Sequence, residues 1–216
     1  MFAREGYSTI VIVVIFAVLV SIGASYINHW SAYIIYAAMI LLVAFILYFF
    51  RDPDREITPG DNHIISPADG NVVLIKEVEE ENYIKGPATQ ISIFLSPLDV
   101  HVNRVPVSGK LEYLEYNPGV YLMAWDERAS ELNERADFGV RHSSGVKVFF
   151  RQITGFMARR IVYHIEEGDE LTAGRRFGMM KFGSRMDILV PAGTEIKVSE
   201  KDKAIAGQTI LATINA

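Results

Sequence analysis

The dipeptide Gly183-Ser184 carries the most distinctive chemistry that this sequence suggests. A serine hydroxyl beside a strained peptide bond can attack the carbonyl of the preceding residue and turn the peptide bond into an ester. Elimination across that ester releases the upstream chain, and the dehydroalanine that remains hydrolyses to a pyruvoyl group. Glycine before the serine favours this reaction, because it has no Cβ and tolerates unusual backbone angles. On its own the same dipeptide is far more often a plain turn between two strands, so it needs support from other residues.

Two further segments carry side chains suited to proton transfer. His101 follows Asp99 in the stretch ISIFLSPLDVHVNRVPVSGK, residues 91–110, and Asp69 lies in the stretch IISPADG, residues 64–70. Each has a structural alternative, because a histidine often serves packing and Asp-Gly is a common turn pair. These residues alone therefore leave open whether His101 and Asp69 act in catalysis.

Composition excludes several other kinds of chemistry. The chain contains no cysteine, which excludes disulfides, thiolate nucleophiles and iron–sulfur clusters. No two of its five histidines are three or four residues apart, so we expect no metal site. The net charge of −5 falls on residues 51–216, and a mildly acidic domain is not expected to bind nucleic acid.

Residues 1–50 contain two uncharged apolar runs, 10–27 and 32–50, separated by the short link 28–31. About 18 to 20 apolar residues are needed for a helix to cross the hydrocarbon core of a bilayer. Neither run has a polar face at helical spacing, which argues against two buried helices of a soluble core. A second apolar run so soon after the first also argues against a cleaved signal peptide. We therefore expect a membrane-anchoring helical hairpin over residues 1–50.

The flanking residues suggest how this hairpin is oriented. Trp30 lies in the link, where interfacial aromatic side chains are common, and basic residues flank the outer ends of the two runs (Arg4, Arg51 and Arg55). By the positive-inside rule both ends, and the domain that follows, lie on the cytoplasmic side of the cell membrane. A hairpin that enters only one leaflet would fit the same residues.

After a linker over residues 51–60, residues 61–216 show the pattern of a mostly β domain. Short segments rich in Val, Ile and Phe alternate with turn residues, and the predicted strands include 70–78, 90–95, 146–153 and 186–190. Residues 118–135 lack strand alternation and are expected to form a helix or a loop.

An internal repeat suggests which β fold this is. Residues 165–174 align without gaps on residues 198–207, and each unit is followed by an apolar strand. The repeat and the motifs PADG (67–70) and PVSG (106–109) resemble barrel-sandwich hybrid folds of the biotinyl and lipoyl type. Neither unit has the lysine that a biotin or lipoyl carrier displays. We expect a mostly β, barrel-sandwich-hybrid-like domain preceded by an α-helical membrane hairpin.

Six motifs in order then resemble one enzyme family, the short, membrane-anchored phosphatidylserine decarboxylases. They are FFRDPDREI (49–57), SPADG (66–70), FLSPLDVHVNRVPVSGKL (94–111), NER (133–135), GFMARRIV (155–162) and FGSRMDILVP (182–191). The last motif and the SPLDVHVNR stretch are the most specific of the six.

This resemblance implies a self-cleaving proenzyme that decarboxylates phosphatidylserine to phosphatidylethanolamine. Cleavage between Gly183 and Ser184 would give a large subunit, residues 1–183, and a small subunit, residues 184–216, that stay associated. Ser184 would become the pyruvoyl cofactor, whose ketone forms a Schiff base with the amino group of the substrate. Asp69 matches the family's carboxylate that assists self-cleavage, and His101 matches its proton-transfer histidine. The expected partners are the membrane and its phospholipid, and a homodimer is compatible with the sequence.

One departure from the longer relatives leaves the base for self-cleavage open. Those relatives have a second histidine three residues after the first, and here that position is Arg104, which stays protonated. His101 could serve both steps, or His164 could approach Ser184. Arg104 and Arg185 are candidates for binding the lipid phosphate or the carboxylate, since a guanidinium group suits both anions.

Two other functions fit these residues less well. A pyruvoyl enzyme acting on a soluble amino acid such as aspartate would not need a 50-residue anchor. A non-enzymatic membrane adaptor with a barrel-sandwich module would need a long coiled-coil insertion, and the sequence contains no heptad run.

Overall fold

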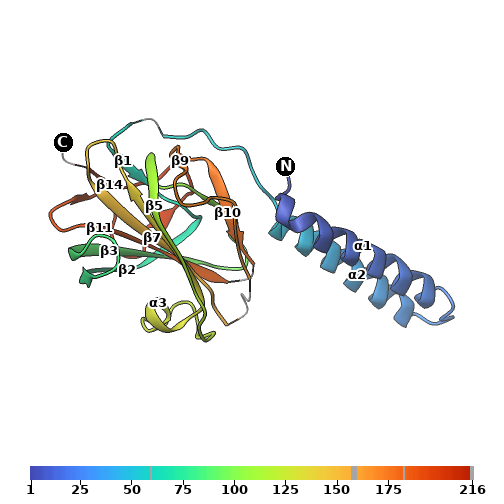
Figure 1. The fold of residues 1–216 in the computed structure, drawn as a ribbon. Helices are drawn as coiled ribbons and strands as arrows, with labels where there is room; N and C mark the ends of the chain where they lie inside the picture. The colour runs from blue at the N-terminus through green and yellow to red at the C-terminus, as the bar shows by residue number, and fades with distance from the viewer. Residues whose placement is uncertain (59, 157–159, 182, 215–216) are drawn as a thin grey trace. The chain divides into compact units, whose positions relative to one another are not determined.

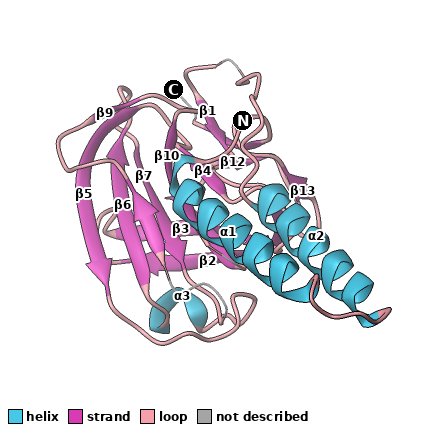
Figure 2. Ribbon diagram, turned by 90° about the vertical axis from the view of Figure 1, so that its right-hand side faces the viewer, coloured by secondary structure: helices cyan, strands magenta, loops and turns pink. Residues whose placement is uncertain are grey.

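The computed structural model describes residues 1–58, 60–156, 160–181 and 183–214. Phe182 and residues 157–159, which belong to two of the motifs quoted above, lie outside the described residues. The chain divides into two compact units, Met1–Asp54 and Arg55–Ala216. Figures 1 and 2 show a pair of helices in the first unit and a β-rich second unit. The predicted fold class, a mostly β domain after a helical hairpin, is confirmed.

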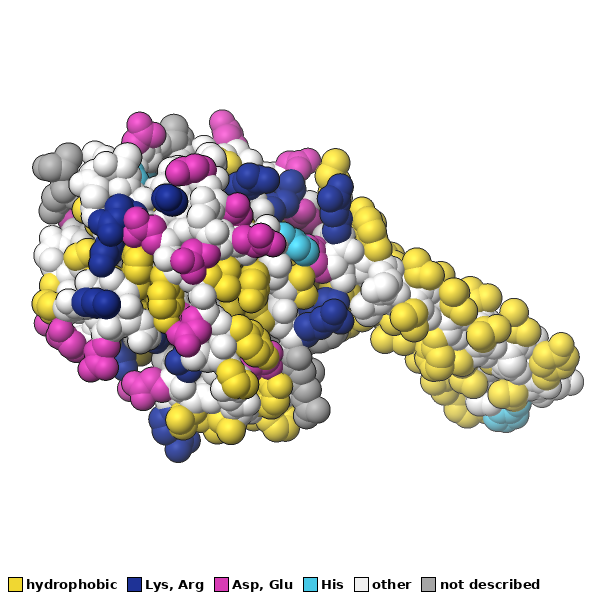
Figure 3. Space-filling view, in the orientation of Figure 1, with side chains coloured by type: hydrophobic (Ala, Val, Ile, Leu, Met, Phe, Trp, Pro, Cys, Tyr) yellow, Lys and Arg dark blue, Asp and Glu magenta, His cyan; other side chains and the backbone are white. Residues whose placement is uncertain are grey.

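The first unit is a hairpin of two α-helices, α1 (Tyr7–Ala24) and α2 (Ser31–Phe49), preceded by the 3₁₀-helix η1 (Arg4–Gly6). Both helices are long and apolar enough to cross a membrane. Hydrophobic side chains cover their surfaces, as Figure 3 shows. The open end of the hairpin is closed by backbone hydrogen bonds from Ala3 N to Phe50 O (2.9 Å) and from Asp52 N to Met1 O (2.8 Å). These features are those expected of a membrane anchor.

The second unit contains all the strands and one short helix. Its elements are β1 (His63–Ile65), β2 (Gly70–Glu80), β3 (Gly86–Leu95), β4 (Val102–Arg104), β5 (Gly109–Asn117), α3 (Ala129–Leu132), β6 (Arg135–Arg141), β7 (Lys147–Ile153), β8 (Ile161–Tyr163), β9 (Glu170–Leu171), β10 (Arg176–Met180), β11 (Ser184–Pro191), β12 (Glu195–Ile196), β13 (Lys203–Ala204) and β14 (Ile210–Thr213). The four strands predicted above correspond to β2, β3, β7 and β11. Residues 118–134 form a loop that carries α3, which settles the helix-or-loop alternative in favour of a loop with one helical turn.

An eight-stranded antiparallel sheet forms most of this unit, in the order β13-β2-β3-β11-β7-β6-β5-β9. Two three-stranded sheets, β1-β14-β12 and β4-β10-β8, complete the unit. The strand β11 lies in the middle of the large sheet, paired with β3 on one side and β7 on the other (Figure 1). Its first residue is Ser184.

The sequence repeat appears in the structure as two matching turns. Asp169 accepts a hydrogen bond from Glu166 N at 2.9 Å, and Asp202 accepts the matching bond from Ser199 N at 2.8 Å. The repeat glycines Gly174 and Gly207 have φ values of +82° and +78°, and both pack closely against Ile57. Each turn leads into an edge strand of the large sheet, β9 or β13.

The symmetry extends beyond these turns to the whole β unit. β13 pairs with the start of β2 at Gly70, and β9 pairs with the start of β5 at Gly109. The β2–β3 and β5–β6 hairpins carry their register shifts at matching places, between Val72 and Leu74 and between Leu111 and Tyr113. The two three-stranded sheets match in the same way, β1 with β4 and β14 with β10, each with one register shift. We call this relation the pseudo-two-fold.

The inner face of the large sheet and the two small sheets enclose one hydrophobic core. At its centre Phe138 stacks on Phe150 with ring centroids 5.1 Å apart, and Phe177 meets both rings edge-on. Because strand residues alternate between faces, Met186, Ile188 and the other even-numbered residues of β11 face this core.

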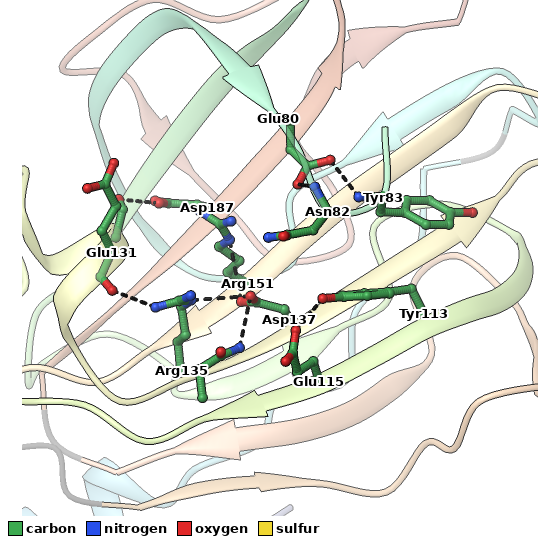
Figure 4. A network of polar contacts seen from close by, with 12 residues as sticks. Glu80, Asn82, Tyr83, Tyr113, Glu115, Glu131, Arg135, Asp137, Arg151 and Asp187 are labelled. Atoms are coloured by element: carbon green, nitrogen blue, oxygen red, sulfur yellow. Dashed lines mark hydrogen bonds and ion pairs between the residues drawn. The ribbon is translucent and has the colours of Figure 1, made fainter. Parts of the chain in front are cut away.

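The odd-numbered residues of β11 face the other side of the sheet, where buried charges are paired. Arg185, 1% exposed, binds Asp187 through Nε at 2.6 Å and Ser92 through Nη2 at 3.0 Å. Close by, Asp137 lies between the guanidinium groups of Arg135 and Arg151 (Figure 4). Burial raises the pKa of Asp137, and the two guanidinium groups oppose that rise. The charges that are buried on this face are thus compensated by ion pairs.

We expect Arg185→Met to destabilise the fold by about 3–5 kcal/mol, because it leaves the buried carboxylate of Asp187 without its cation. The double variant Arg185→Met/Asp187→Leu should regain much of that loss, since it removes both charges. Thermal and urea unfolding of the detergent-solubilised chain measures both effects. A double variant as unstable as the single one would show that the ion pair itself stabilises the sheet.

Candidate active site

Ser184 is completely buried at the point where β11 begins. Its Oγ atom is less than 1 Å² exposed and has no hydrogen-bond partner among the described residues. Leu95 of β3 lies beside it across the sheet, and the same face of β11 continues into the core through Met186. A buried hydroxyl without a partner is unfavourable, and such groups often mark a reactive position.

The peptide bond before Ser184 lies in an unusual backbone conformation. Gly183 has a φ of +61°, the left-handed region that favours glycine. Its carbonyl oxygen packs against Gly155, where an added Cβ would lie 2.5 Å from that oxygen and 3.0 Å from the Cβ of Ala124. Gly155 follows the end of β7, and Ala124 belongs to the loop that carries α3. Two glycines thus set the position of the carbonyl that a Ser184 attack would reach.

His101 is the titratable side chain closest to this peptide bond among the described contacts. It is completely buried, and its Nε2 atom accepts a hydrogen bond from Gly183 N at 3.4 Å. Its Nδ1 atom lies 2.9 Å from the carbonyl oxygen of Asp99. A carbonyl only accepts and a backbone N–H only donates, so both contacts fit the neutral tautomer with the proton on Nδ1. In that tautomer the lone pair of Nε2 faces the Gly183–Ser184 segment.

The local structure around Asp99 explains how the ring is held. The carboxylate of Asp99 closes a tight turn by accepting bonds from Ser96 N at 2.9 Å and Ser96 Oγ at 2.7 Å. This turn links β3 to β4 and fixes the carbonyl oxygen of Asp99, which accepts the hydrogen bond from His101 Nδ1–H. Asp99 therefore orients His101 through its backbone rather than through its charge.

Asp69 has other partners. Its Oδ2 atom pairs with Arg55 at 2.7 Å, and its Oδ1 atom accepts a bond from Ala206 N at 2.9 Å. The pseudo-two-fold position is Ser108, whose Oγ accepts the matching bond from Ala173 N at 3.0 Å. Asp69 thus holds one of the two repeat turns, and its expected help in self-cleavage stays a prediction.

The two arginine candidates lie apart from the serine side chain. Arg185 faces the outer side of the sheet, opposite to Ser184, where its guanidinium group binds Asp187. Arg104 donates to Gly174 O at 2.9 Å, and its side chain passes 3.2 Å from the Cβ position of Gly207. It occupies the opposite side of β4 from His101. These positions favour structural roles for both arginines over contacts with substrate at Ser184.

The third proton-transfer candidate, His164, is exposed, whereas Ser184 is completely buried. The structure therefore brings together Ser184, Gly183 and His101 out of the predicted set.

Two other buried polar side chains near this group were not predicted from the sequence. Asn103 follows His101 at the next inward position of β4, and Gln152 lies opposite Met186 on β7. The sequence hinted only weakly at Asn103. It stands two and four residues before the valines Val105 and Val107 in HVNRVPV (101–107), and this alternate spacing is that of inward-facing strand residues. For Gly155 the sequence showed only a glycine after a predicted strand, a general sign that another part of the backbone approaches closely there.

Comparison with known proteins gives a consistent answer. The family model for phosphatidylserine decarboxylase matches residues 42–212. A phosphatidylserine decarboxylase proenzyme of Salinibacter ruber is 55% identical over 175 residues, 80% of this chain and 77% of the relative. Proenzymes of the same description from Symbiobacterium thermophilum (43% identical; 97% of this chain, 94% of the relative) and Prosthecochloris aestuarii (41%; 99% and 98%) match nearly end to end.

The family model covers the β unit with the Gly183–Ser184 segment, and the two nearly end-to-end relatives also cover the anchor, as the ordered motifs led us to expect. The chain belongs to the phosphatidylserine decarboxylase family, and it is an enzyme that decarboxylates phosphatidylserine.

Proposed function

We propose that this chain is a proenzyme that cuts itself between Gly183 and Ser184 and uses the resulting pyruvoyl group to decarboxylate phosphatidylserine at the membrane. The observation that carries the proposal is the arrangement of three groups at one peptide bond. These are a buried Ser184 hydroxyl without a partner, a left-handed Gly183 and the Nε2 lone pair of His101. The description of the relatives as proenzymes also supports self-cleavage of this chain.

Self-cleavage begins with proton transfer from Ser184 Oγ to His101 Nε2. The oxygen attacks the Gly183 carbonyl carbon, the C–N bond breaks, and the amino group of residue 184 takes up the proton. A base then removes the Cα hydrogen of residue 184, and the Gly183 carboxylate leaves from Cβ. The dehydroalanine at the new N-terminus takes up water, releases ammonia and becomes a pyruvoyl group. Because His101 Nε2 accepts a hydrogen bond from Gly183 N, next to Ser184, we assign the role of base to His101 rather than to Arg104 or His164.

In the second reaction the pyruvoyl group supplies an electron sink for the pair of electrons that the departing CO2 leaves behind. We assign the return of a proton to that carbon to His101, whose Nε2 atom contacts Gly183 N beside residue 184. The apolar neighbours of Ser184, such as Leu95 and Met186, exclude water and strengthen polar contacts there.

The position of β11 accounts for how the two subunits stay together. Residues 184–216 begin with this strand, which is hydrogen-bonded to β3 and β7 of the large subunit. The rest of the small subunit adds β12, β13 and β14 to sheets completed by large-subunit strands. A cut at Gly183 therefore breaks one covalent bond without removing a strand from the sheet.

The anchor supports a lipid substrate that stays in its bilayer. We place the β unit on the cytoplasmic side of the cell membrane, because Arg4 and Arg51 flank the outer ends of the two apolar helices. A decarboxylase for a soluble amino acid has no need of such helices.

Ser184→Ala should give a single, uncut chain that releases no CO2, because it removes both the nucleophile and the precursor of the cofactor. Intact-mass analysis of the wild type should show two fragments, residues 1–183 and 184–216, the smaller with a blocked N-terminus. A wild-type chain that is active while uncut would refute the proposal.

His101→Ala should slow self-cleavage by roughly 10²- to 10⁴-fold, the usual contribution of a general base. The rate follows from a gel time course after synthesis of the chain. His142→Ala is the matched control, since His142 is also buried in the β unit but its ring bonds Ser144 in a distant turn. Equal rates in the two variants would argue against His101 as the base.

Gly155→Ala should slow self-cleavage at least tenfold, because the new Cβ would push on the Gly183 carbonyl oxygen. Gly86→Ala is its control, since an added Cβ there meets nothing within 4 Å. The same time course measures both variants, and wild-type cleavage of Gly155→Ala would show that this contact does not position the carbonyl.

A further inference from the structure

The side chains of Asn103 and Gln152, called here the amide pair, are both completely buried. Gln152 Nε2 donates to Asn103 Oδ1 at 2.8 Å. The other two polar atoms of the pair, Asn103 Nδ2 and Gln152 Oε1, have no partner among the described residues. One buried donor and one buried acceptor are therefore left over, each at a cost to stability.

The pseudo-two-fold shows that the fold does not require amides at these positions. Asn103 of β4 corresponds to Ile64 of β1, next to the register shift in each small sheet. In the large sheet the pseudo-two-fold relates β11 to β7, and the paired residues Ile188 and Phe150 are equivalent. Two residues further along each strand, Val190 of β11 therefore corresponds to Gln152 of β7. Ile64 and Val190 are both completely buried core residues. The same architecture thus holds an apolar pair in one half and a polar, half-satisfied pair in the other.

The amide pair lies at the end of the large sheet where β11 begins with the reactive serine. Asn103 is the next inward residue of β4 after His101, whose ring reaches Gly183. Gln152 lies across from Met186, the next inward residue of β11 after Ser184. The backbone of Gly178 leaves room for the pair, since a Cβ there would lie 3.1 Å from Gln152 Nε2. The two free atoms therefore belong to the layer of side chains next to Ser184 and His101.

We propose that the amide pair is the subsite for the serine head group of the lipid: Asn103 Nδ2 donates to its carboxylate, and Gln152 Oε1 accepts from its amino nitrogen. An α-amino acid head group carries one acceptor and one donor side by side, and the pair offers the complementary set. The product, an ethanolamine lipid, lacks the carboxylate and can use only the acceptor. This inference rests on the proposed function, because it assumes that residue 184 reacts with the head group.

A neutral amide suits a carboxylate that is about to leave as CO2. A guanidinium group would bind the charged ground state strongly, and that binding would be lost as the charge moves out of the carboxylate. Only contacts that are stronger in the transition state than in the ground state raise the rate. An amide N–H orients the carboxylate with a weaker hold on its charge. This agrees with the position of Arg104 and Arg185 away from the inward face.

The test uses the purified full-length enzyme in mixed micelles with Asn103→Ile and Gln152→Val, which copy the apolar pair of the other half. Self-cleavage is scored first on a gel. Cyanoborohydride then traps the bound amine on the 184–216 fragment, and mass spectrometry gives the lipid concentration for half-maximal trapping. Phosphatidylserine and phosphatidylethanolamine are compared.

We expect both variants to cleave like the wild type. Asn103→Ile should raise the half-maximal concentration for the serine lipid at least tenfold and leave that for the ethanolamine lipid unchanged. Gln152→Val should raise both. Gln90→Leu is the control, because Gln90 is a buried amide on the outer face of the same sheet, bound to Ser92 and Asp187. It should leave the preference between the two lipids unchanged.

A double variant that keeps the wild-type preference for the serine lipid would overturn the proposal. Loss of self-cleavage both in Asn103→Ile and in the nearly isosteric Asn103→Leu would also overturn it, because the pair would then serve the fold or the cut rather than the substrate. A wild-type chain that does not cut itself would instead refute the proposed function. The two failures are therefore distinguishable.

Discussion

The hydrogen bonding of β11 on both of its edges is the constraint on which the rest of the β unit depends. Its residues pair with β3 from Ser184 to Pro191 and with β7 from Arg185 to Leu189. A strand held in this way cannot shift its register, and a shift of one residue would exchange its two faces. The side chain of Ser184 is therefore fixed toward the core and that of Arg185 toward the ionic cluster on the other side. The reactive position and the sheet that supports it are set by the same pairing.

The pseudo-two-fold gives a way to separate what the fold needs from what the chemistry needs. Where the two halves carry similar contacts, as with Asp69 and Ser108 on the two repeat turns, a structural role is sufficient. Where they differ, an apolar core residue in one half corresponds to a polar residue in the other, as with Ile64 and Asn103. The departures gather at one end of the β unit, around His101 and Ser184. Duplication of a small β motif followed by polar substitution in one half would produce this arrangement.

Much of this fold follows from patterns that the sequence displays directly. Uncharged runs of membrane length predicted the two helices, and the aligned repeat predicted the matching turns at Asp169 and Asp202. The motifs led to Gly183, Ser184 and His101, which the structure brings together. The strand order was not predictable, because β11 follows β10 in sequence yet pairs with β3 and β7. Pairing between distant segments depends on the complete core rather than on local preference.

The same limit explains why the site was predicted only in part. An arginine next to the candidate serine suggests anion binding, but Arg185 alternates with Ser184 along β11 and so faces away from it. Gly155 matters through its approach to the Gly183 carbonyl, a contact across two separate chain segments. Such residues carry no local pattern, and only the three-dimensional arrangement reveals them.

Burial of the site in the uncut chain has an energetic consequence that links folding to function. Three polar atoms, Ser184 Oγ, Asn103 Nδ2 and Gln152 Oε1, are buried without partners among the described residues, at a cost of about 1–3 kcal/mol each. In the proposed reaction the cut removes the Ser184 hydroxyl and frees the chain end at Gly183, whose backbone N contacts His101. Substrate then reaches the other two and satisfies them. In this proposal a site that is unsatisfied while the chain is whole becomes favourable only after cleavage, so the step that creates the cofactor also opens the place where the head group binds.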